Sequence, residues 1–87
     1  MPEREQPNAV YELLYGVLSP LLGKLTGRKA IELACEQCGL LLARLKPGDY
    51  EALRERLRPM MRTLIGQGPT ERVLDAIAAR LEEGRVD

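Results

Sequence analysis

The chain has 87 residues, which suits a single domain, and its 13 basic and 13 acidic side chains leave no net charge at neutral pH. This balance argues against bulk electrostatic attraction to nucleic acid or to an anionic membrane, and the absence of histidine removes the commonest general base of enzymes. Sixteen leucines, with three tyrosines and no phenylalanine or tryptophan, favour an all-α fold, because β-branched and aromatic residues are the ones that stabilise strands.

The first predicted helix covers residues 8–25. Asn8 is a suitable N-cap, because its side-chain oxygen can accept a hydrogen bond from an N–H group of the first turn. Apolar residues then recur every three or four positions, which places them on one helix face. Pro20 falls inside this pattern, so we expect a kink there.

The second predicted helix covers residues 27–45 and is apolar around most of its circumference. Such a helix lies at the centre of a fold or is shared with a partner. Leu41 sits in the middle of its apolar stripe, so Leu41→Ala is predicted to cost roughly 2–5 kcal/mol of stability.

Two further helices follow. The third is predicted over residues 50–65, with Asp49 as its N-cap and a kink near Pro59. The fourth is predicted over residues 71–83, with Thr70 as its N-cap. The predicted inward faces are Tyr50, Leu53, Leu57, Met60 or Met61 and Leu64 on the third helix, and Val73, Leu74, Ile77, Ala78 and Leu81 on the fourth.

Together these segments predict a compact bundle of four helices forming one domain over residues 8–84. We expect residues 1–7 to be disordered or extended and residues 85–87 to be frayed. The polar, charged start of the chain argues against a secretory signal, and no apolar run is long enough to span a bilayer.

Cys35 and Cys38 form a Cys-x-x-Cys pair and are weak candidates for a metal or redox site. Cys35 lies well inside the second predicted helix, so it lacks the helix N-terminus that activates a redox thiol. Two thiolates are half of a tetrahedral zinc site, which a second copy of the chain would have to complete. The favoured interpretation is two buried, reduced thiols that are not joined to each other.

Arg54, Arg58 and Arg62 recur every four residues on the third helix, a spacing that could follow phosphates. Acidic residues share that surface, so a solvated and partly paired face is the favoured interpretation. The last two helices could also be a helix-turn-helix, but residues 66–87 carry more acidic than basic groups, which argues against DNA binding.

The residues favoured for contact with a partner combine aromatic, leucine and methionine side chains, which adapt well to an apolar surface. They are Tyr11, Tyr15, Leu18, Leu22, Leu42, Met60 and Met61.

The sequence therefore predicts a small non-catalytic module for protein–protein interaction or regulation, acting as a homodimer in the cytoplasm of a bacterium or archaeon. It predicts no cofactor and no membrane contact, and it leaves open a further protein partner. Two alternatives remain: a thiol-based metal or redox sensor that uses Cys35 and Cys38, and a small nucleic-acid-binding regulator.

Overall fold

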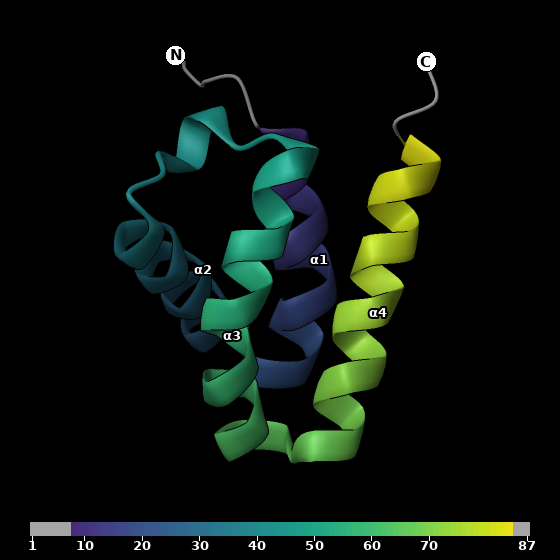
Figure 1. Cartoon of the computed structure of the whole chain (residues 1–87). Coiled ribbons are helices and arrows are strands. Elements are labelled where there is room, and N and C mark those ends of the chain that lie inside the picture. Colours follow the sequence, from purple (N-terminus) through teal and green to yellow (C-terminus); the bar gives the residue numbers. More distant parts are fainter. Residues whose placement is uncertain (1–7, 85–87) are drawn as a thin grey trace.

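The computed structural model describes residues 8–84, and the regular structure of this part of the chain is entirely helical (Figure 1). The predicted all-α bundle of four helices is therefore confirmed. The expectations for residues 1–7 and 85–87 fall outside the described residues. The elements are α1 (Ala9–Leu22), α2 (Lys24–Cys38), the short 3-10 turns η1 (Leu42–Arg44) and η2 (Pro47–Asp49), α3 (Tyr50–Ile65) and α4 (Gln67–Gly84).

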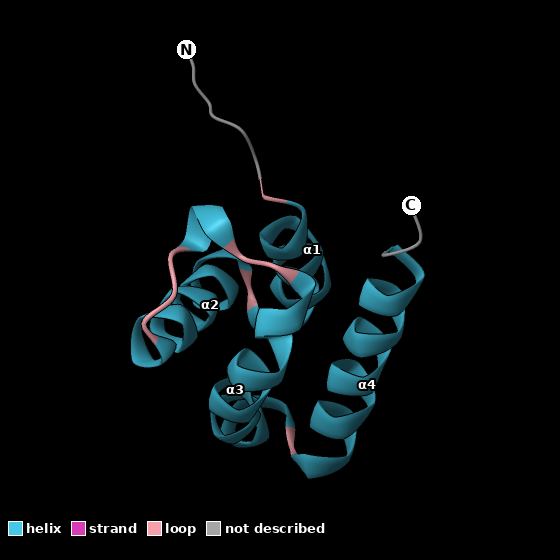
Figure 2. Ribbon diagram, turned by 45° about the horizontal axis from the view of Figure 1, so that its top comes forward, coloured by secondary structure: helices cyan, strands magenta, loops and turns pink. Residues whose placement is uncertain are grey.

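The four helices pack as a ring in which α1 contacts α2, α2 contacts α3, α3 contacts α4, and α4 returns to α1. Figure 1 shows α2 and α4 on opposite sides of α3, with α1 behind. Gly23 alone joins α1 to α2 and Gly66 alone joins α3 to α4, whereas residues 39–49 connect the two pairs (Figure 2). The fully buried large apolar side chains are Leu14, Leu18, Ile31, Leu53, Leu57, Met61, Leu74 and Ile77. Over residues 8–84, every helix is too short or too polar to cross a lipid bilayer.

Asn8 begins α1 as the sequence predicts, since its Oδ1 accepts a hydrogen bond of 3.0 Å from the N–H of Tyr11. The same side chain has a second role. Its Nδ2 donates to the carbonyl oxygens of Leu45 at 3.0 Å and Ala43 at 3.3 Å. Asn8 therefore fastens the start of α1 to the link between α2 and α3, a contact between distant segments that no local pattern could reveal.

Pro20 and Pro59 both lie inside helices, Pro20 in the last turn of α1 and Pro59 in α3. The chain remains helical on both sides of each proline, which is consistent with the kinks predicted near Pro20 and Pro59. The helix that contains Pro20 ends at Leu22, short of the predicted residue 25. Gly23 follows it as the C-cap, with its N–H donating to the carbonyl of Ser19.

The predicted end of the second helix at residue 45 is wrong, because α2 stops at Cys38. Gly39 takes a left-handed conformation, with φ 70° and ψ 28°, and its N–H donates to the carbonyls of Cys35 and Glu36. The apolar spacing continues past this glycine, but the backbone does not remain α-helical. Leu41 consequently lies in the link and is 66% exposed, so the burial on which the large cost of Leu41→Ala was predicted is absent.

The bounds predicted for the third helix are confirmed by α3, but two details are not. Met61 is fully buried and Met60 half-buried, whereas Leu64, predicted to face inward, is 53% exposed. Asp49 does not cap α3 through its side chain, since its carboxylate accepts a 3.0 Å hydrogen bond from the N–H of Lys46 and closes η2 instead. The helix continues directly from that turn, so it needs no separate cap.

The fourth helix starts earlier than predicted, at Gln67, so Thr70 is not its N-cap. Thr70 lies in the first turn, fully buried, and its hydroxyl donates to the carbonyl of Gly66 at 2.6 Å. Pro69 is tolerated there because the first N–H groups of a helix have no partner within it. The inward face is confirmed: Leu74 and Ile77 are buried, and Val73, Ala78 and Leu81 are half-buried against the core.

Candidate functional site

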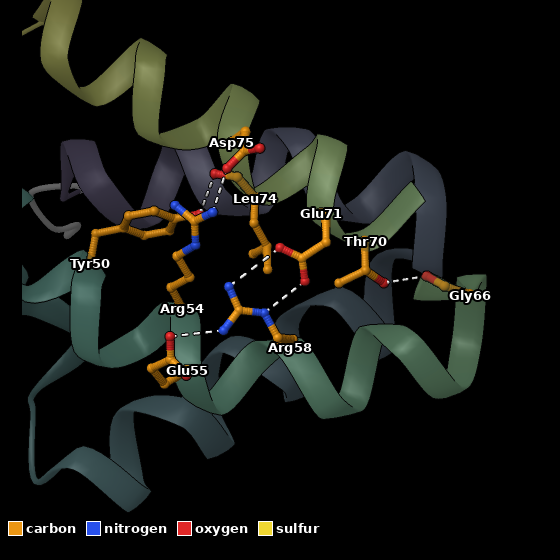
Figure 3. Close-up of polar contacts among 9 residues, drawn as sticks. All are labelled: Tyr50, Arg54, Glu55, Arg58, Gly66, Thr70, Glu71, Leu74 and Asp75. Atoms are coloured by element: carbon orange, nitrogen blue, oxygen red, sulfur yellow. Dashed lines mark hydrogen bonds and ion pairs between the residues drawn. The ribbon is translucent and has the colours of Figure 1, made fainter. Parts of the chain in front are cut away.

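Two arginines of the stripe on α3, Arg54 and Arg58, are turned toward α4 and paired with it (Figure 3). Arg54 pairs with Asp75, and Arg58 donates to Glu71 at 2.7 Å and to Glu55 at 2.8 Å. The side chains of Arg54 and Arg58 are only 18% and 22% exposed. The predicted partial pairing is confirmed, but the face is less solvated than expected. Two of the three arginines that could follow phosphates are thus occupied in holding two helices together.

Tyr50 supports the same contact from inside the bundle (Figure 3). Its hydroxyl is buried and donates a 2.7 Å hydrogen bond to the carbonyl oxygen of Leu74 in α4. Burial raises the pKa of the Tyr50 phenol. A neutral tyrosine with its proton committed to a main-chain carbonyl is a structural residue, poorly suited to acid–base chemistry.

The two cysteines lie in the last turn of α2 and are not joined by a disulfide. Cys35 is 2% exposed, as predicted, but Cys38 is half-buried, so the prediction that both are buried is wrong for Cys38. Burial raises the pKa of the Cys35 thiol, and Cys38, Asp49 and Glu32 raise it further. Because the thiolate is the reactive form, this environment disfavours reaction at Cys35. Within residues 8–84, no three cysteine, histidine, aspartate or glutamate side chains converge as metal ligands would.

The two thiols are expected to react at different rates with a thiol-specific reagent. Cys38→Ser leaves only Cys35, which should react roughly tenfold or more slowly than the Cys38 that remains in Cys35→Ser, until denaturant exposes it. Ellman titration of the two variants measures this difference. Equal, rapid labelling of both, or silence of both until a chelator is added, would instead support the sensor alternative.

Two of the residues predicted to bind a partner belong to the core. Leu18 and Met61 are fully buried within the single chain, so neither contributes to a surface of this fold. Tyr11 and Tyr15 lie one turn apart on α1, half-buried, with their rings stacked 5.8 Å apart between centroids and 17° from parallel. Leu22, Leu42 and Met60 are also half-buried, and Met60 lines the groove described next.

An apolar groove of about 360 Å³ lies between α2 and α3. Leu33 from α2 is 43% exposed, Leu64 from α3 is 53% exposed, and half-buried Met60 lies with them in the wall. The sequence indicated Met60 but missed both leucines, because Leu64 was predicted to face inward and Leu33 belongs to a predicted helix that is apolar around most of its circumference. The groove is lined by Thr26, Lys29, Ala30, Leu33, Met60, Thr63 and Leu64. Among these lining residues Lys29 is charged, and the others are apolar or are uncharged threonines.

A second hollow, of about 390 Å³, lies between the start of α3 and the end of α4. The charged groups in its wall, Glu51 and Glu82, are both exposed, and the hydroxyl of Tyr50 is engaged by Leu74. Small-molecule sites usually hold their ligand with a few convergent polar groups, and this wall offers none that is both buried and available. The lining residues are Pro47, Gly48, Tyr50, Glu51, Ala78, Leu81 and Glu82.

The search for relatives adds no functional information: no protein-family model, curated protein or solved structure matches the chain. The groove between α2 and α3 is therefore identified as the candidate site from its physical features alone. It combines exposed leucines from two adjacent helices with a concave shape, and exposed apolar surface of this kind is typical of an interaction site.

Proposed function

We propose that the protein is a non-catalytic interaction module that acts as a homodimer, with the groove between α2 and α3 at the contact. The observation that carries the proposal is the exposure of Leu33 and Leu64 on the two walls of that groove. Burying such side chains against a second copy removes apolar surface from water, which stabilises the assembly.

The size of the chain supports the same proposal. A domain this small buries only about 60–65% of the surface that its unfolded chain exposes, and oligomerisation is one way to bury more. A stable interface needs roughly 800 Å² from each partner, so the groove must be extended by neighbouring surface. Leu25, 70% exposed and two turns before Leu33 on α2, can supply such an extension.

The polar features of the bundle favour an interaction module over the two alternatives. Arg54 and Arg58 are paired with α4, which weakens a role in nucleic-acid binding. The raised pKa of Cys35 weakens a role in sensing through reactive thiols. Two thiols that are not joined to each other suit the reducing cytoplasm of a bacterium or archaeon, which we infer to be the location.

Sedimentation velocity at micromolar concentration tests the proposal. The wild-type protein is expected at twice the 9.7 kDa mass of one chain, whereas Leu64→Glu should be monomeric, because a carboxylate would have to be desolvated in the interface. Ala79→Glu places the same charge at an exposed position of α4, the helix on the other side of α3 from α2 (Figure 1), and should remain dimeric.

Circular dichroism of each variant confirms that the helices are intact before masses are compared. A wild-type protein that sediments as a monomer up to high micromolar concentration would contradict the proposed function. A dimer that resists Leu64→Glu but is lost in Ala79→Glu would place the contact on another face.

A further inference from the structure

The charges of α2 are divided between its two halves. Lys24, Arg28 and Lys29 occupy the first half, and Glu32 and Glu36 occupy the second. Lys29 and Glu36 are exposed, and within residues 8–84 neither forms an ion pair. Arg28 and Glu32 pair with each other at 2.9 Å along the helix.

This order of charges is unfavourable for the stability of α2 itself. The N-terminal end of a helix bears partial positive charge and the C-terminal end partial negative charge, so acidic residues belong at the start and basic residues at the end. In α2 the first turn contains no acidic residue and the last turn no basic residue. Helix stability therefore does not explain the pattern, whereas a second surface of opposite polarity would.

The same division makes α2 complementary to an antiparallel copy of itself. An antiparallel partner brings its acidic half opposite the basic half, and its basic half opposite the acidic half. A parallel partner would oppose like charges, which is unfavourable. The dipoles of two antiparallel helices also attract each other.

The residue spacing fixes where the two copies would meet. Lys29 comes four residues before Leu33, and Glu36 comes three residues after it, so all three lie on one side of the helix. A two-fold axis close to Leu33 therefore places Lys29 against the partner's Glu36, and Glu36 against the partner's Lys29. The two copies of Leu33 meet at the axis, beside the groove wall that Met60 and Leu64 supply.

We propose that two copies of the chain pair through antiparallel α2 helices about a two-fold axis near Leu33, with reciprocal ion pairs between Lys29 and the partner's Glu36. This inference rests on the proposed homodimer and specifies its geometry. An isologous contact of this kind uses each surface once and closes the assembly at two chains.

Charge reversal distinguishes this geometry from other dimers. Lys29→Glu and Glu36→Lys, each alone, oppose like charges in both pairs and should raise the dissociation constant of the dimer roughly tenfold. The double variant Lys29→Glu/Glu36→Lys restores both pairs and should recover most of the wild-type affinity. Arg80→Glu, an exposed charge reversal on α4, is the matched control and should leave the dimer unchanged.

Mixing the two single variants gives the sharpest result, because every pair across their mixed dimer is complementary. With one variant labelled with ¹⁵N, native mass spectrometry should show the mixed dimer well above the statistical half of all dimers. A wild-type dimer with a statistical mixture, and with unchanged affinity in the single variants, overturns the antiparallel pairing and leaves the homodimer in place. A monomeric wild-type protein overturns both.

Discussion

Leu53→Ala is expected to lower the free energy of unfolding by about 2–5 kcal/mol. Leu53 is fully buried in α3, the helix that packs against both α2 and α4, so its removal leaves a cavity that surrounding side chains fill only in part. Since a domain of this kind is stable by only about 5–15 kcal/mol, the loss would be a large share of the total. Urea denaturation followed by circular dichroism measures it.

Leu41→Ala is the matched control for Leu53→Ala. It removes the same atoms from a side chain that is 66% exposed in the link after α2, so its effect should stay within about 0.5 kcal/mol. Both proteins are compared at one chain concentration, because dimerisation would shift the midpoint. Equal losses in the two variants would mean that Leu41 is buried and that α2 continues past Gly39.

Gly27→Leu is expected to destabilise the fold by about 3 kcal/mol, because Gly27 lies where α2 passes against α1. A Cβ atom at this position would lie 3.3 Å from both the Cα and the N of Ser19, and 3.4 Å from the carbonyl carbon of Leu18. These are main-chain atoms, which cannot rotate away as the end of a side chain can. The two helices would have to separate, which would loosen the core on both sides.

Gly16→Leu provides the comparison, since Gly16 is exposed in α1 and nothing lies within 4 Å of a Cβ built there. Replacing a glycine in an open helical position by leucine should raise stability by roughly 0.5–1 kcal/mol, because leucine loses less conformational freedom on folding. Opposite signs in the two variants, seen in thermal melts, are the expected result. A stabilised Gly27→Leu protein would show that α1 and α2 are not in close contact at this point.

The sequence predicts the helices of this protein better than their ends. The bounds of α3 and the inward face of α4 follow from apolar spacing, which the core then uses. The end of α2 does not, because leucines continue at helical spacing beyond Gly39 and hide the turn that this glycine makes. The start of α4 was also hidden, since Gly68 and Pro69 resemble a loop although the first turn of a helix accepts both.

The candidate site was harder to predict than the fold. Leu33 and Leu64 carry the same apolar signal as core residues, and only the packing of α2 against α3 decides that they stay exposed. Conversely, Leu18 and Met61 were expected at a surface but are enclosed by helices from other parts of the chain. Periodicity identifies the apolar side of a helix but not which of its edges a neighbouring helix covers.

The single-residue joints at Gly23 and Gly66 have a kinetic consequence. Because each connection is one residue long, α1 can pack against α2, and α3 against α4, with little loss of loop entropy. Much of the bundle is therefore assembled from neighbours in sequence, and proteins dominated by such local contacts fold in microseconds to milliseconds. The step that remains is the docking of the α1–α2 hairpin onto the α3–α4 hairpin, which residues 39–49 connect. Leu45, buried in that link, is expected to leave water only at this step. Folding speed should accordingly depend more on the contacts between the hairpins than on the formation of either one.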